Sequence, residues 1–147
     1  MPDPSPSDPH QLARFQAAQD RDGTHDTALG ELRQGRKRTH WMWFIFPQLA
    51  GLGRSPTAQH YAISGLDEAR AYLADPVLGP RLRECTEALL GLGDRSAEQV
   101  LGQIDALKLR SSMTLFARAA PEERSFGRVL EQWFGGEADP LTEQLLG

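Results

Sequence analysis

Apolar residues recur along most of this chain at intervals of three and four, the spacing of one face of an α-helix. The clearest such run comprises Leu78, Leu82, Cys85, Leu89 and Leu92. A second run comprises Phe126, Val129, Leu130, Trp133 and Phe134. Alternation of apolar and polar residues, which is typical of strands, does not extend over a useful length. The pattern therefore predicts an all-α fold class: a compact multihelical domain of about seven to nine helices, several of them short.

Capping residues and helix breakers set the expected ends of these helices. Residues 1–7 are rich in Pro, Ser and Asp, which predicts a disordered N-terminal tail before a single helical domain over residues 8–147. Helix starts are predicted at Asp8, Ser64, Asp75, Ser96 and Asp139. In two of these, Ser64 with Asp67 and Ser96 with Gln99, the three-residue spacing predicts a capping box. Gly35 is the expected end of a helix over 26–34.

The segment WMWFIF, residues 41–46, permits two interpretations. Its aromatic and β-branched residues favour a strand. However, Thr39 could cap a short helix that Pro47 would end, and the chain contains no partner strand. Since a buried strand without a partner leaves its backbone hydrogen bonds unmade, we expect a helix here.

Composition limits the classes of function. The chain has 147 residues, a formal net charge of −4 and one cysteine, Cys85. The negative charge argues against a nucleic-acid or membrane-surface protein. The single cysteine excludes an internal disulfide, and its place on an apolar helix face favours a buried structural thiol. The N-terminus lacks a secretory pattern, and the longest apolar run is too short to span a membrane. We therefore expect a cytoplasmic protein without a membrane partner.

Candidate chemistry is densest between Gly35 and Ser64, where basic and aromatic residues adjoin. Tryptophan faces beside cationic side chains suit a ligand that combines a planar ring with phosphate. The simpler alternative is that these aromatic residues form the core of the domain. A Gly-x-Gly turn, GLGRS, follows in the same region, and a plain tight turn explains it at least as well as a phosphate-binding loop. The candidate ligand-binding residues here are Arg36, Arg38, His40, Trp41 and Trp43.

A second polar group, Lys108 with Ser111 and Ser112, lies within an otherwise good helix. Serines are mildly unfavourable in a helix interior. They are expected either to bond back to carbonyl oxygens one turn earlier or to face a cavity together with Lys108. Ligand hydrogen bonding is then preferred to a Ser–Lys nucleophile, because the S-x-x-K order is missing. The histidines lack the spacing of metal ligands, so no metal and no cofactor are predicted.

Long motifs carry a family resemblance. GRKRTHWMWFIFPQLAGLGRSP at residues 35–56, YAISGLDEARAYLADPVLGPRLREC at 61–85 and DALKLRSSMTLFARA at 105–119 resemble a bacterial family of domains of unknown function. The central elements are GRKR-x-HWMWFIFPQ and LKL-x-SSMTLF. Some members of that family carry the label "calpastatin", which the helical pattern does not support because calpain inhibitors of that type are long and disordered. The resemblance implies an almost entirely helical single domain and no established activity.

Two functional hypotheses follow. The first is a cytosolic protein that binds a small anionic, nucleotide-like ligand where residues 35–64 meet residues 108–114; its enzymatic form would be a hydrolase or transferase, but the sequence contains no standard catalytic signature. The alternative is a helical protein-interaction or regulatory module whose basic and aromatic surface contacts an acidic partner. The net charge of −4 makes nucleic acid the least favoured ligand.

Overall fold

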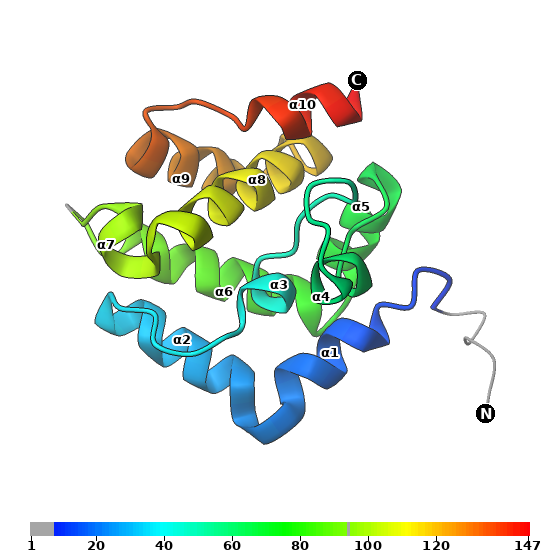
Figure 1. The fold of residues 1–147 in the computed structure, drawn as a ribbon, viewed down its shortest axis with the longest axis horizontal. Helices are drawn as coiled ribbons and strands as arrows, with labels where there is room; N and C mark the ends of the chain where they lie inside the picture. The colour runs from blue at the N-terminus through cyan, green and yellow to red at the C-terminus, as the bar shows by residue number, and fades with distance from the viewer. Residues whose placement is uncertain (1–7, 94) are drawn as a thin grey trace.

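Helices make up the secondary structure of the computed structural model, which describes residues 8–93 and 95–147 (Figure 1). The elements are α1 (Ala13–Asp20), the 3-10 helix η1 (Arg21–Gly23), α2 (Thr24–Gln34), α3 (Met42–Ile45), α4 (Pro56–His60), α5 (Leu66–Ala74), α6 (Leu78–Leu90), α7 (Ala97–Leu101), α8 (Gln103–Ala119), α9 (Arg124–Phe134) and α10 (Pro140–Leu146). In these residues the β-structure is a single isolated bridge. The all-α prediction is therefore confirmed, including several short helices. The predicted tail, residues 1–7, lies outside the described residues.

Helix α8 is the central element of the fold. It packs against α5, α7, α9 and α10, and Figure 1 shows it running between α6 on one side and α9 with α10 on the other. Every residue from Ser111 to Phe116 is buried, so this part of α8 is enclosed on all sides, as expected of a core helix. Its position brings the Lys108 region into contact with elements from both ends of the chain.

Three predicted helix ends are confirmed, and each is set by local chemistry. Gly35 ends α2 in the left-handed conformation, with φ of +78°, which glycine adopts without steric cost. The capping box at α7 is complete: Ser96 accepts from the backbone N–H of Gln99, whose side chain accepts from that of Ser96. Asp139 caps α10 by accepting from the backbone N–H of Thr142 at 3.1 Å.

The predicted helix start at Asp8 is wrong, because α1 begins only at Ala13. Gln11 has a φ of +54°, a left-handed conformation that interrupts any helix starting at Pro9. The Asp8 carboxylate instead accepts from the backbone N–H groups of Leu12 at 2.7 Å and Ala13 at 3.1 Å. It thus satisfies donors at the start of the helix from a position further back along the chain.

The predicted capping box at Ser64 is also wrong. The N-cap of α5 is Gly65, which makes no side-chain cap. Ser64 donates from its backbone and its hydroxyl to the Glu68 carboxylate, at 2.9 and 2.8 Å. Glu68 is the residue next to Asp67, and it also pairs with Arg14 at 2.8 Å. A tertiary ion pair has therefore replaced the local cap.

The WMWFIF segment forms a helix, as predicted, but only over four residues. Its aromatic side chains divide between two environments: Trp41 and Phe46 are fully buried in the core, whereas Trp43 and Phe44 are only partly buried. Nearly all of the buried apolar residues of the described chain form one connected cluster. None of the described helices combines the length and apolar character needed to cross a membrane.

Candidate functional site

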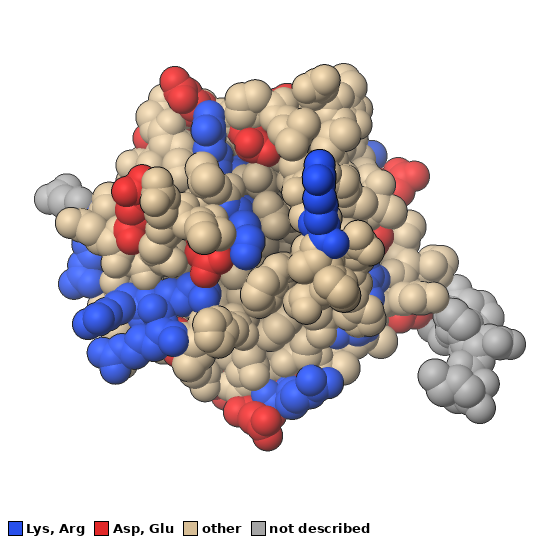
Figure 2. Space-filling model, viewed as in Figure 1, with Lys and Arg blue, Asp and Glu red and all other residues tan. Residues whose placement is uncertain are grey.

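A cleft of about 540 Å³ lies between the segment around α4 and the first half of α8. It is lined by Trp43, Gln48, Leu52, Gly53, Arg54, Ser55, Ala58, Ile104, Leu107, Lys108, Ser111, Asp139 and Leu141. These residues come from α3, the α3–α4 loop, α4, α8 and the start of α10. The face shown in Figure 2 includes the junction of α8 with the loop before α4.

One wall of the cleft is an excursion of the chain over residues 48–63. A parallel bridge closes its base, with Ala50 N–H donating to Ile63 at 2.7 Å and Ile63 N–H donating to Gln48 at 2.8 Å. Within the excursion, Gly53 packs so tightly on Ala58 that an added Cβ would lie 2.5 Å from the Ala58 Cβ. The second glycine of the Gly-x-Gly turn is therefore needed for packing, and this packing fixes the path of the chain along this wall.

The opposite wall is formed by α8 and α10 and is strongly apolar. Ile104 is 72% exposed, Leu107 60% and Leu141 48%, and all three line the cleft. Large apolar side chains gathered at an open cleft are typical of binding surfaces, whereas single exposed ones are ordinary. The apolar area makes this cleft suited to a ligand that buries carbon as well as charge.

Lys108 and Trp43 meet across the cleft. The Lys108 ammonium nitrogen lies 4.5 Å from the centroid of the Trp43 ring, within the range of a cation–π contact. Asp105 holds the lysine from the other side at 3.4 Å and pairs with Lys37 at 2.9 Å. One carboxylate thus faces two ammonium groups, so this end of the cleft keeps a net positive charge.

The hydroxyl groups of α8 are largely committed within the protein. Ser111 lies 3.2 Å from the Leu107 carbonyl oxygen and 3.0 Å from the Asp139 carboxylate. Thr114 donates to the Arg110 carbonyl at 2.8 Å. The expectation that such hydroxyls bond back one turn therefore holds for Ser111 and Thr114 but not for Ser112, and Ser111 in addition helps to hold α10 on α8.

The predicted site residues separate into three groups. Trp43, Lys108 and Ser111 come together at the cleft, although they are distant in sequence. Trp41 and Ser112 are buried; the Trp41 indole donates to Glu31 at 2.9 Å, and the Ser112 hydroxyl has no partner among the described residues. Arg36, Arg38 and His40 are exposed and do not line the cleft.

Sequence reasoning missed two kinds of cleft residue. The side chains of Gln48 and Arg54 line the cleft and make no hydrogen bond or ion pair within residues 8–93 and 95–147. Arg54 belongs to the GLGRS turn, where an exposed arginine had no visible partner. Ile104 and Leu107 carried a usable signal, since their i, i+3 spacing places them off the face of α8 that Leu109 and Met113 bury. Apolar residues on a second face of a helix can indicate a binding surface.

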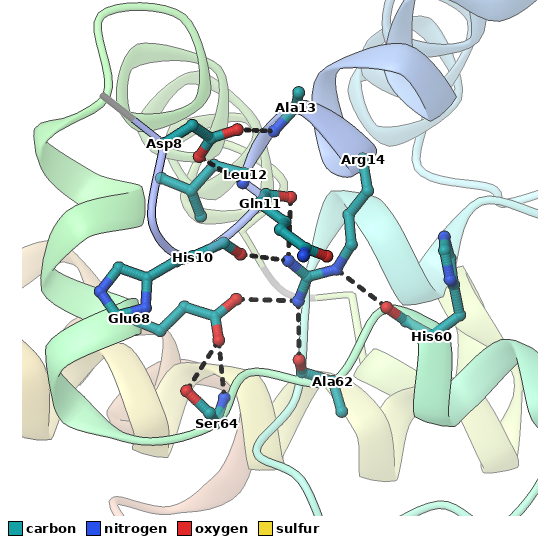
Figure 3. A network of polar contacts seen from close by, with 10 residues as sticks. All are labelled: Asp8, His10, Gln11, Leu12, Ala13, Arg14, His60, Ala62, Ser64 and Glu68. Carbon is teal, nitrogen blue, oxygen red and sulfur yellow. Dashed lines mark hydrogen bonds and ion pairs between the residues drawn. The ribbon is translucent and has the colours of Figure 1, made fainter. Parts of the chain in front are cut away.

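A second polar cluster, centred on Arg14, is different in character (Figure 3). The guanidinium donates to the backbone oxygens of His10, Gln11, His60 and Ala62 at 2.7–3.0 Å and to Glu68 at 2.8 Å. All five N–H donors of the arginine are therefore used. This cluster joins the start of α1 to the end of α4 and the start of α5, and it serves the fold.

The shifted pKa values of Cys85 and Glu31 bear on the candidate chemistry. Burial raises the pKa of the Cys85 thiol to about 12, so the thiolate needed of a nucleophile is disfavoured and the structural interpretation fits. For Glu31, burial by itself raises the pKa, but hydrogen bonds from Arg38, Thr39 and Trp41 outweigh it and lower the pKa below 4.5. Within the described residues, no cluster of three or more His, Cys, Asp or Glu side chains could hold a metal.

Comparison with known proteins identifies a family whose description gives no function. The family model described as "Protein of unknown function (DUF1810)" matches residues 9–146. The fold is similar to that of the conserved hypothetical protein Rv1873 from Mycobacterium tuberculosis, known from its crystal structure, with a TM-score of 0.92 and 51% sequence identity. The match covers 95% of this chain and 98% of that protein. No match was found among curated proteins.

Proposed function

This chain belongs to the family described as proteins of unknown function (DUF1810), and from its cleft we propose that it binds a small anionic ligand with a flat, partly apolar body, of which a nucleotide is one kind. The observation that carries the proposal is the meeting of the Lys108 ammonium and the Trp43 ring, 4.5 Å apart, inside a mainly apolar cleft. Of the residues expected from the sequence, the proposal uses Trp43, Lys108 and Ser111.

The charged groups of the cleft favour an anion. Lys108 and Arg54 both line it, and the Arg54 side chain has no partner in the described part of the chain. The single carboxylate of the lining, Asp139, is already bound by Ser111 and by the N-terminus of α10. Two cations against one committed carboxylate leave an uncompensated positive charge, which phosphate or carboxylate groups neutralise well.

The rest of the lining favours a flat apolar body. Trp43 is partly buried and lines the cleft together with the apolar side chains of Leu107 and Leu141. Between them a ring system would exclude water on both faces, and aromatic stacking adds to that gain. The Gln48 side chain, which has no partner among the described residues, would donate and accept hydrogen bonds at the edge of such a ring. A cytoplasmic location, where phosphorylated metabolites are abundant, belongs to the same proposal.

The test is a thermal-shift and calorimetric titration with three matched probes: AMP, adenosine without the phosphate, and ribose 5-phosphate without the ring. We expect AMP to stabilise the protein more than either fragment. At about 100 times Kd, a ligand adds about 2.7 kcal/mol to the free energy of unfolding, or several degrees in Tm for a chain of this size. A panel of other nucleotides and aryl phosphates extends the screen. If none of these compounds shifts Tm at millimolar concentration, the proposal is wrong.

Variants locate the binding. Lys108→Gln and Arg54→Gln each remove one charge-assisted contact and should weaken binding about tenfold. Arg128→Gln is the matched control, because Arg128 is an exposed arginine on α9 outside the cleft. Equal affinity in the wild type and both cleft variants would place the ligand elsewhere and contradict the proposal.

A further inference from the structure

The loop from Gly35 to Trp41, here called the arginine loop, is held by hydrogen bonds to one buried carboxylate, that of Glu31. Glu31 accepts hydrogen bonds from the backbone N–H groups of Arg38 at 2.7 Å and Thr39 at 3.1 Å. It also accepts from the Thr39 hydroxyl at 2.7 Å and from the Trp41 indole at 2.9 Å. Four bonds to one carboxylate hold the loop in a single course along the end of α2.

The middle residue of the basic run is a second anchor. The backbone N–H of Lys37 donates to the Val100 carbonyl at 2.7 Å, and its ammonium pairs with Asp105 at 2.9 Å. The same ammonium lies 5.0 Å from the Trp41 ring centroid, and the side chain is only 8% exposed. Lys37 is therefore part of the interior, although the sequence places it in a continuous cationic run.

Because Lys37 points inward, Arg36 and Arg38 both point outward. Both are exposed, and neither makes an ion pair within residues 8–93 and 95–147. Arg95 joins them: its guanidinium donates to the Gln34 carbonyl at 2.9 Å and lies against Gly35. Figure 2 shows basic side chains gathered where α2 ends and the chain turns towards α3. Three guanidinium groups thus share one rigid surface of a protein whose net charge is −4.

We propose that the arginine loop is a docking surface for an acidic segment of a partner protein, with Arg36 and Arg38 binding its carboxylates. Guanidinium forks match carboxylates in a bidentate geometry, and a loop fixed in advance loses little entropy on binding. Single-stranded nucleic acid is less suited, because such sites add exposed aromatic rings on which bases stack. Here Trp41 is fully buried beneath the loop. This surface does not depend on the ligand proposed for the cleft.

The test is fluorescence anisotropy at low ionic strength with a labelled Glu- and Gly-containing dodecapeptide as the probe. Its Gln-for-Glu counterpart and a labelled single-stranded oligonucleotide are the comparison probes. We expect the acidic peptide to bind and the neutral peptide not to bind. Affinity should fall steeply as salt rises, since the contacts are exposed. In the Arg36→Gln/Arg38→Gln double variant it should fall about fivefold to tenfold.

The matched control is Arg124→Gln/Arg128→Gln, which removes the same charge from exposed positions of α9. It should retain wild-type affinity for the peptide, and the Arg36→Gln/Arg38→Gln variant should still bind AMP if the cleft binds it. Equal losses in both double variants would mean non-specific attraction and would overturn the proposal. Stronger binding of the oligonucleotide than of the acidic peptide, or no peptide binding at low salt, would overturn it as well.

Discussion

The Arg14 cluster and the cleft at Lys108 both place cations beside carboxylates, yet they differ in how many of their polar groups have hydrogen-bond partners. Around Arg14, all five guanidinium donors have acceptors, and both Glu68 oxygens are engaged (Figure 3). In the cleft, the side chains of Arg54 and Gln48 have no partner within residues 8–93 and 95–147, and large apolar side chains stay exposed. A dense polar network therefore indicates structure when it is complete, whereas uncommitted groups beside exposed apolar surface indicate binding.

The largest expected effect tests this contrast with two arginines. Arg14→Ala leaves Glu68, whose side chain is 5% exposed, without its cation, and it deprives four backbone oxygens of a donor. We expect a loss of about 3–5 kcal/mol in the free energy of unfolding, measured by urea denaturation. Arg54→Ala should change it by less than about 0.5 kcal/mol. If the two variants were equally stable, the distinction between a structural and an available arginine would fail.

A second test uses Glu31, whose carboxylate is as fully bonded as Glu68 but supports an exposed loop. Because its pKa in the folded protein is lowered below 4.5, it contributes stability that is present above that pH. This contribution is lost as the pH falls through the lower folded value. The Glu31→Gln variant should be less stable at neutral pH by about 1–3 kcal/mol. Its stability should also fall less between pH 5 and pH 3 than that of the wild type.

The Glu31 measurement is a pair of denaturation series over that pH interval. Glu98→Gln is a suitable control, because Glu98 is exposed and lies in the first turn of α7. Parallel pH profiles for the wild type and Glu31→Gln would show that the four hydrogen bonds do not couple protonation to folding.

The smallest expected effect concerns the apolar wall of the cleft. Leu107→Ser should change the free energy of unfolding by less than about 0.5 kcal/mol, because Leu107 is 60% exposed. Leu109→Ser, two positions along the same helix, should cost several kcal/mol because Leu109 is fully buried. A large loss in Leu107→Ser would mean that this wall belongs to the core, and the contrast with the Arg14 cluster would need revision.

Sequence predictions that depended on interactions between residues close together in the chain succeeded, whereas one that depended on a distant residue failed. The caps at Ser96 and Asp139 and the glycine stop at Gly35 were predictable because each involves residues a few positions apart. The predicted start at Asp8 failed on one left-handed residue, Gln11, for which the sequence carries no signal. At Ser64 the nearby carboxylate of Asp67 was the natural choice, and the distant Arg14 overrode it by requiring Glu68.

For the candidate site, the sequence showed which types of residue gather there, but it did not show which side chains enter the core and which face the cleft. Helical spacing within residues 41–46, four of which are aromatic, does not say that Trp41 enters the core while Trp43 reaches the cleft. That division depends on Glu31, which captures the Trp41 indole, and on Lys108, which lies over the Trp43 ring. Likewise, the cationic run is split by Asp105, which draws Lys37 inward.

By itself, then, the amino-acid sequence determined the helical class, several helix boundaries and the regions where cations and aromatic rings gather, because these depend on local spacing and capping. Only the tertiary structure decided which of those groups have partners within the protein and which stay available for binding. Whether an arginine or a tryptophan is structural or available depends on partners brought from distant parts of the chain. Arg14 meets five acceptors and Arg54 meets none among the described residues, although both are single arginines beside polar loops.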